Sequence, residues 1–221
     1  MEQIYTELCD HLLSKHASDP NRRILVAIAG IAGSGKTTIS SELERRLNNR
    51  GVGAIAVSMD GYHLTRKELD DFDNPSEAHA RRGAFWTFNP HGLLQLVRCL
   101  REQQENVIYA PSFDHAVGDP IGYDICIEPR HKIVLLEGLY LHLSKPEPWS
   151  LINTYMNENW FVDIDVMVAR ERVIQRHIAS GLAKNNQEAA HRFDTNDLLN
   201  ANYILENRIV PTRTIRSIST S

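Results

Sequence analysis

The stretch Ile24-Leu-Val-Ala-Ile-Ala29, followed directly by Gly30-Ile-Ala-Gly-Ser-Gly-Lys-Thr37, decides the fold of this 221-residue chain. Its first part is a continuous apolar run rich in β-branched side chains, which is typical of a strand buried on both faces of a parallel sheet. The residues after Lys36 recover a helical period of apolar residues that ends at Gly51. The stretch therefore predicts a buried strand, a glycine-rich turn and a helix in immediate succession.

The glycine-rich turn matches the pattern G-x-x-x-x-G-K-[ST] at every fixed position, in the strand, turn and helix context that this motif requires. Glycines allow the main chain to curl so that successive N–H groups, backed by the positive end of the following helix, point at phosphate oxygens. Lys36 would neutralise charge on the β- and γ-phosphates of a nucleotide, and the Thr37 hydroxyl would bind Mg²⁺. We expect the nucleotide-binding residues of this loop to be Gly30, Ile31, Ala32, Gly33, Ser34, Gly35, Lys36, Thr37 and Thr38.

Apolar runs and helical periods alternate along the rest of the chain. The runs predict strands at residues 54–57, 133–136, 161–168 and 214–218, and the helical spacing predicts helices over residues 1–17 and 90–100. Residues 170–206 also have a helical period, which is broken at Gly181 and again around residues 194–197. This alternation favours a three-layer α/β sandwich with a mostly parallel central sheet, formed by residues 1–221 as a single domain. Residues 60–89 and 111–129 are polar and irregular, and the aromatic residues of the first stretch indicate an insert, about 60–90, that lines a pocket.

The composition argues against several classes of protein. Hydrophobic residues make up 42% and charged residues 24% of the chain, and 24 Lys and Arg against 28 Asp and Glu give a net charge of −4. We therefore expect small partners rather than a nucleic acid or an anionic membrane. The longest apolar run ends at Gly30, far short of a membrane span. Acidic residues near the start argue against a signal peptide, which favours a cytoplasmic protein.

Two acidic residues follow predicted strands. Glu137 ends the apolar run that starts at Ile133, where its carboxylate could orient Mg²⁺ or be an ordinary surface acid. Asp60 follows the strand after the phosphate-loop helix, and ligand groups in open α/β sheets lie at such carboxyl ends. It could accept the proton of a substrate hydroxyl, or it could be a turn residue before Gly61. The chain contains no N-K-x-D string, which weakens a GTPase interpretation.

Six short segments carry a resemblance to a known family. They are Gly30–Thr37, Met59–His63, Arg81–Ala84, Pro111–His115, Leu136–Leu139 and Asn207–Arg213. In this order they resemble the uridine kinase, phosphoribulokinase and bacterial pantothenate kinase family of P-loop kinases over nearly the whole chain, and the uridine kinase-like branch most of all. The resemblance implies ATP and Mg²⁺ as cofactors, a three-layer P-loop fold with a helical lid, and ATP-dependent phosphorylation of a small alcohol.

The resemblance also implies roles for single residues. Asp60 resembles the catalytic or substrate-orienting aspartate of the family, and Glu137 resembles its Walker B acid, near Thr37 and Mg²⁺. Arg213 resembles an arginine beside the adenine, and His115 resembles a substrate-contacting histidine, with a solvated loop histidine as the alternative. The acceptor pocket expected from the sequence consists of Asp60, Tyr62, His63, Arg82, Phe85, Asp114 and His115.

Two positions depart from the pattern of this family. Phe85 stands where the family has proline, which changes the wall of the expected pocket and leaves the substrate undefined. Asn89 stands where an aspartate is usual, and it retains the ability to cap the helix that starts at Pro90.

Residues 170–216 hold eight Lys and Arg against five Asp and Glu. Arg172 and Arg176 are four residues apart, so they share a helix face that could close over a triphosphate or lie solvated. The segment of about 170–200 resembles the lid of the family, in which the two arginines would stabilise the transferring phosphoryl group. Asp197 also matches a position of the family, with helix capping as the alternative explanation.

These observations predict a kinase that transfers the γ-phosphate of ATP to a hydroxyl of a nucleoside, a vitamin or a sugar-like metabolite. The catalytic residues would be Asp60, Lys36, Arg172 and Arg176, and the metal-binding residues would be Thr37 and Glu137. The alternative is a nucleotide-binding regulatory ATPase without a small-molecule acceptor. A homodimer is compatible with the sequence, which does not determine the oligomeric state.

Overall fold

Five parallel strands form the central sheet of the computed structural model, which describes residues 1–114 and 117–217. The strand that precedes the glycine-rich loop, β1 (Ile24–Ala29), lies in the middle. It pairs with β5 (Ile133–Gly138) on one side and with β6 (Glu158–Asp163) on the other. The outer strands are β2 (Ala54–Ser58) and β7 (Arg213–Arg216). The predicted parallel α/β sheet is confirmed, since every neighbouring pair in this sheet runs parallel.

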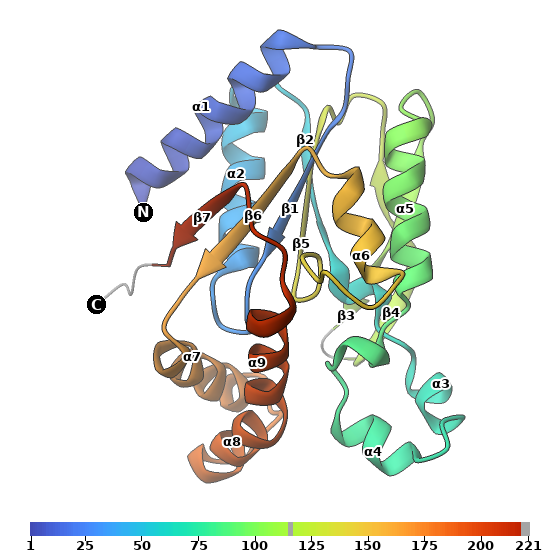
Figure 1. Cartoon of the computed structure of the whole chain (residues 1–221), viewed down its shortest axis with the longest axis vertical. Helices are drawn as coiled ribbons and strands as arrows, with labels where there is room; N and C mark the ends of the chain where they lie inside the picture. The colour runs from blue at the N-terminus through green and yellow to red at the C-terminus, as the bar shows by residue number, and fades with distance from the viewer. Residues whose placement is uncertain (115–116, 218–221) are drawn as a thin grey trace.

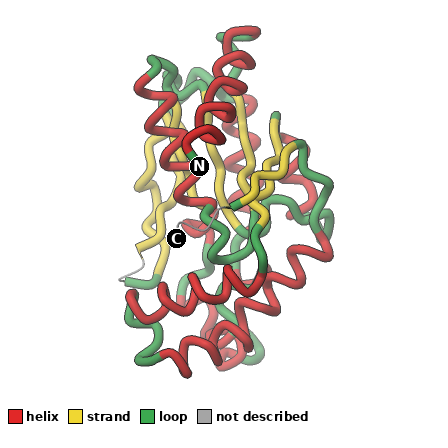
Figure 2. Tube along the Cα trace, turned by 90° about the vertical axis from the view of Figure 1, so that its left-hand side faces the viewer, coloured by secondary structure: helices red, strands yellow, loops and turns green. Residues whose placement is uncertain are grey.

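Helices cover both faces of this sheet (Figure 1). One face carries α1 (Glu2–Ser18) and α2 (Lys36–Asn49), and the other carries α5 (Pro90–Glu102) and α6 (Trp149–Ile152). The remaining helices gather beyond the carboxyl ends of the strands (Figures 1 and 2); they are α3 (Arg66–Asp70), α4 (Pro75–Ala80), α7 (Val166–Ala179), α8 (Asn186–Arg192) and α9 (Leu198–Asn207). In the part of the chain that the structure describes, no helix is both long enough and apolar enough to cross a bilayer.

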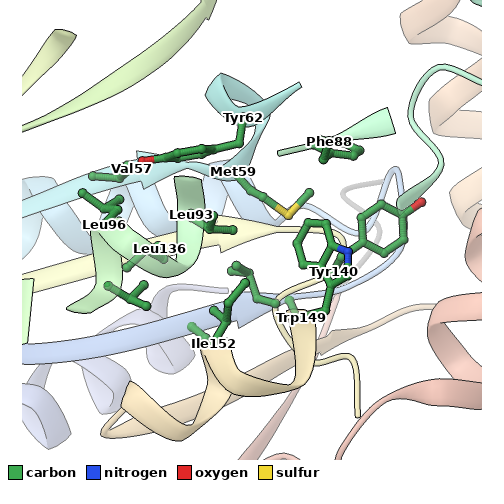
Figure 3. Packing of buried hydrophobic residues seen from close by; sticks show 14 of the residues in the cluster. Val57, Met59, Tyr62, Phe88, Leu93, Leu96, Leu136, Tyr140, Trp149 and Ile152 are labelled. Carbon is green, nitrogen blue, oxygen red and sulfur yellow. The ribbon is translucent and has the colours of Figure 1, made fainter. Parts of the chain in front are cut away.

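The alternation of side chains along β1 divides the core into two clusters. Val26 and Ile28 face α1 and α2, whereas Leu25 and Ala27 face the cluster beneath α5 and α6. Figure 3 shows part of this second cluster, in which Tyr140 packs edge-on against other aromatic rings. All six residues of β1 are buried, because helices cover the sheet on both sides.

A buried arginine joins the elements at the amino end of β1. The Arg23 side chain is 1% exposed, and its guanidinium donates to the main-chain oxygens of His131 at 2.9 Å, Glu128 at 3.1 Å and Gln104 at 3.2 Å. These carbonyls belong to the loop before β5 and to the end of the α5 region. Arg23 therefore supplies donors to three main-chain oxygens at once, of which that of Glu128 also accepts from the N–H of His131.

The prediction of an irregular stretch at 111–129 is wrong for most of these residues. Most of them belong to two antiparallel strands that pair with each other, β3 (Ile108–Asp114) and β4 (Asp119–Ile127). Most positions of β4 are exposed or half-buried, so the strand lacks the apolar alternation by which a strand is recognised. The polar stretch 60–89 likewise contains the short helices α3 and α4, each with a side-chain N-cap.

The strand predicted at 161–168 is shifted. In the structure β6 ends at Asp163 and α7 begins at Val166, because the Asp165 carboxylate accepts from the N–H groups of Met167 and Val168 and caps the helix. The residues that follow Asp165, Val166 to Val168, are all apolar and two of them are β-branched, so hydrophobicity alone did not separate strand from helix.

Candidate active site

Two positions of the loop between β1 and α2, Gly30 and Gly33, leave no room for a side chain. Gly33 has φ +78°, and a Cβ atom there would lie 2.7 Å from the main-chain oxygen of Ala169 on α7. A Cβ atom on Gly30 would lie 2.7 Å from the main-chain oxygen of Val162 on β6. The main chain of the loop therefore packs directly against the main chain of β6 and α7. Its peptide groups lie at the start of α2, and the N-terminus of a helix stabilises anions.

Lys36 is folded back onto this loop. Its side chain is buried, and Nζ donates to the main-chain oxygen of Ile31 at 3.1 Å. Burial lowers the pKa of Lys36, and the nearby carboxylates of Glu137 and Asp60 oppose this effect. The ammonium group thus lies in a buried position between the loop and two acids.

Thr37 and Glu137 lie next to each other at the start of α2 and the end of β5. Thr37 Oγ1 donates to Glu137 Oε1 at 3.3 Å. Burial raises the pKa of Glu137, and the charge of Lys36 partly opposes this. A hydroxyl and a carboxylate side by side are oxygen donors of the kind that Mg²⁺ prefers. Within the described residues no group of three or more His, Cys, Asp or Glu is arranged to hold a metal ion, so water or phosphate oxygens would complete the coordination of a Mg²⁺ ion held here.

Two cavities meet at the loop. A cavity of about 390 Å³ is lined by the loop, Met1, Tyr5 and Arg172, and a larger one of about 660 Å³ is lined by Asp60 and Glu137 among others. Lys36, Thr37 and Arg176 line both of them. A phosphate chain on the loop would consequently have its terminal group at the junction of the two cavities.

The predicted lid arginines take different positions at this junction. Arg172 Nη1 donates to the main-chain oxygen of Gly33 at 3.2 Å and to Ser217 Oγ at 2.9 Å, and Arg172 lines the smaller cavity. Arg176 is exposed at the shared wall of the two cavities. Of these two arginines, only Arg176 therefore lies at both the phosphate loop and the larger cavity.

Three of the residues predicted for the acceptor pocket line the larger cavity, namely Asp60, His63 and Arg82. The His63 ring lies 4.7 Å from the Phe113 ring, and its Nδ1 is 2.9 Å from the main-chain oxygen of Asp60. The Arg82 guanidinium already binds other groups of the protein, because it pairs with Asp119 at 2.8 Å and donates to two main-chain oxygens.

The structure places other predicted site residues elsewhere. Tyr62 is 7% exposed and packs in the core beneath α5 (Figure 3), and Phe85 stacks on Tyr203 with ring centroids 4.6 Å apart. Arg213 lies on β7, beside Trp160, and lines neither of the two described cavities. His115 and the Asp114 side chain lie outside the described residues. Asn89 caps α5, as its residue type predicts, by accepting from the N–H of Gly92.

The sequence did not indicate several residues of the larger cavity, which are Arg66, His79, His177 and Arg192. Asp197, noted only for its match to a family position, also lines it. Burial raises the pKa of Asp197 to about 6 even though Arg176 and Arg192 oppose this. Burial and the same two arginines lower the pKa of His177 to about 4. These side chains come from separate helices, so no local spacing could have grouped them.

A parallel sheet whose central strand leads through a glycine-rich loop into a helix, with a buried lysine and a paired hydroxyl and carboxylate at the loop, defines the P-loop class of nucleotide-binding proteins. Within this class, residues 25–182 match the sequence model of the Phosphoribulokinase / Uridine kinase family. The chain belongs to this family, as its motifs predicted, and family membership makes it a P-loop kinase.

Similar proteins come from fungi and bacteria. The Schizosaccharomyces pombe protein "Putative uridine kinase C227.14" is 42% identical over 192 residues, which cover 86% of this chain and 81% of that protein. "ATP-dependent kinase YFH7" of Lachancea thermotolerans is 34% identical over 216 residues, which cover 83% of this chain and 62% of that longer protein. The crystal structure of a "putative fructose transport system kinase" from Silicibacter sp. TM1040 has a TM-score of 0.85 at 29% identity and covers 96% of this chain and 98% of its own.

Proposed function

We propose that this protein transfers the γ-phosphate of ATP to a hydroxyl group of a small molecule bound in the larger cavity. The observation that carries this proposal is the junction of the two cavities at Lys36, Thr37 and Arg176, with Asp60 on the wall of the larger one. A phosphate held on the loop can then face an acceptor held beside a carboxylate, which is the arrangement that in-line transfer needs.

The loop and its lysine would hold the nucleotide. The main-chain N–H groups at the start of α2 bind phosphate oxygens, and the Lys36 ammonium exchanges its contact with the Ile31 oxygen for the β- and γ-phosphates. Thr37 and Glu137 would hold Mg²⁺, which neutralises phosphate charge when it is bound. We place Arg213 beside the adenine on the basis of the family resemblance alone.

Asp60 would prepare the acceptor. Its carboxylate accepts the proton of the acceptor hydroxyl while that oxygen forms a bond to the γ-phosphorus, and the bond from this phosphorus to the bridging oxygen breaks to leave ADP. Arg176, at the shared wall, would stabilise the charge on the transferring oxygens, and Arg172 would do so after release from Ser217. We interpret the segment of about 170–200 as the lid that excludes water during this step.

A coupled assay of ADP release over nucleosides, vitamins and sugars tests the proposal. We expect Asp60→Asn to lower turnover at least ~10²-fold while ATP affinity stays nearly unchanged, because general-base and positioning effects have this size. Asp73→Asn is the matched control, since Asp73 is an exposed aspartate of the same segment. Equal turnover in both variants would remove Asp60 from the mechanism. Release of inorganic phosphate at the same rate whatever alcohol is added would instead indicate a regulatory ATPase.

A further inference from the structure

Three carboxylates among the described residues line the larger cavity, and Asp197, unlike Asp60 and Glu137, has no part in the proposed phosphoryl transfer. We propose that Asp197 binds a second hydroxyl of the acceptor, so that the substrate of this kinase is an uncharged polyol. This inference rests on the proposed function, because it concerns the acceptor of the same reaction.

The local structure gives Asp197 no capping role. Residues 193–197 form a π-helical turn that runs directly into α9, and Asp197 itself has helical dihedral angles, φ −65° and ψ −37°. Its side chain makes no capping hydrogen bond to α9, so the capping alternative raised by the sequence does not hold. A π turn inside a helix often marks a functional position. Here it places Asp197 at the cavity wall.

One oxygen of this carboxylate has no hydrogen-bond donor. Asp197 Oδ2 is buried and has no hydrogen-bond partner among the described residues. His177 Nε2 lies 3.6 Å from Oδ2, which is too long for a hydrogen bond. Leaving a buried acceptor unsatisfied is costly, so the site is built for an occupant that donates to it.

The charges around Asp197 define what this donor can be. Arg176 of α7 and Arg192 of α8 lie close enough to favour its ionised form, and the burial that raises its pKa to about 6 still leaves it mostly ionised above pH 7. His177 is uncharged at that pH, so it adds no positive charge beside Asp197. The Tyr140 hydroxyl donates to the main-chain oxygen of Gly83 instead of to Asp197. A carboxylate accepts but does not donate, so an ionised acidic group has no hydrogen to give to Asp197 Oδ2, whereas an ammonium group placed there would be repelled by the two arginines. A neutral hydroxyl can donate to Asp197 without that repulsion.

The second hydroxyl also gives Asp197 a role distinct from those of Asp60 and Glu137, which line the same cavity. Asp60 would receive the hydroxyl that reacts, and Asp197, contributed by a separate element, would orient the molecule through a hydroxyl that does not react. A single-hydroxyl acceptor would leave Asp197 Oδ2 unsatisfied in the bound state. The reaction itself is unchanged, because Asp197 takes no proton from the acceptor.

The test compares polyols with acids and then removes single hydroxyls. Ribitol, xylitol, glucitol and uridine, whose uncharged ribose also carries several hydroxyls, are assayed beside the acids glycerate and pantothenate by coupled ADP release, and the preferred polyhydroxy compound is then replaced by its deoxy analogues, each lacking one hydroxyl. We expect one hydroxyl other than the reacting one to contribute about 10- to 100-fold in kcat/KM, the size of a hydrogen bond to a charged group. In Asp197→Asn the same deletion should cost much less, while the KM for ATP stays unchanged.

Asp194→Asn is the matched control, because Asp194 lies in the same turn, is exposed and pairs with Arg170. The deoxy series on the wild-type chain is informative even if Asp197→Asn fails to fold. Preference for glycerate or pantothenate over every polyol, or an equal deoxy penalty in wild type and Asp197→Asn, would overturn this inference and leave the kinase proposal standing. Phosphorylation of no acceptor in the panel would overturn both.

Discussion

The substitution Gly33→Ala tests whether contact between the phosphate loop and α7 sets the geometry of the nucleotide site. At φ +78° a residue with a Cβ atom costs about 1–2 kcal/mol more than glycine. The added methyl would also lie 2.7 Å from the Ala169 oxygen and 3.0 Å from Val173 Cγ2, and relief of such overpacking typically costs another 1–3 kcal/mol or so. We expect a loss of about 2–5 kcal/mol in the free energy of unfolding.

Gly51→Ala is the control that separates the two contributions. Gly51 has φ +81°, and a Cβ atom there would meet no described atom within 4 Å, so only the backbone cost of about 1–2 kcal/mol applies. Urea unfolding of both variants measures the difference, and titration calorimetry measures ATP affinity. Gly33→Ala should weaken ATP binding about tenfold or more, because a displaced loop loses binding free energy, and each loss of about 1.4 kcal/mol lowers the affinity tenfold. Equal losses of stability and equal ATP affinity in the two variants would refute the reasoning.

Two further predictions concern buried basic residues. Burial lowers the pKa of His142 to about 4, so between pH 6.5 and 4 the unfolded chain binds a proton that the folded chain does not, and stability falls as the pH drops through this range. The wild type should lose roughly 2 kcal/mol between pH 7 and 5 through this residue, and His142→Gln should lose that much less; parallel urea curves for both proteins would contradict this. Arg23→Met should lower the free energy of unfolding by about 3 kcal/mol or more, because the carbonyls of His131 and Gln104 lose their guanidinium donor and that of Glu128 loses one of its two donors. The exposed Arg22→Met should change it by less than about 0.5 kcal/mol in the same denaturation experiment, and similar effects of the two would show that the buried contacts contribute little.

The prediction of the fold rested on local sequence patterns. The apolar run of β1, the glycine-rich loop and the helical period of α2 each depend on neighbours within a few residues, and the structure has all three where the sequence predicts them. The pair of strands β3 and β4 was missed because most of β4 is exposed or half-buried. Strand and helix at 161–168 were confused because the Asp165 cap, rather than a change in hydrophobicity, separates them.

The expected site depended on residues that are far apart in the sequence, and only some of the residues expected for the acceptor pocket line the larger cavity. Tyr62 looked like a pocket residue because it stands beside Asp60, yet the chain turns there, so Asp60 lines the cavity and Tyr62 enters the core. Arg82 lies at the cavity, but its guanidinium is bound to Asp119. The direction of a side chain in an irregular segment depends on its tertiary contacts, which the sequence does not list.

The sequence by itself determined the central strand, the phosphate loop and the family, because these follow from short spacings and from residue types that few other structures require. Only the tertiary structure decided that two cavities meet at Lys36 and that Asp197, 137 positions beyond Asp60, lines the same cavity as that residue. The physical reason is that the carboxyl ends of parallel strands converge at one edge of the sheet, where helices from distant parts of the chain pack over them.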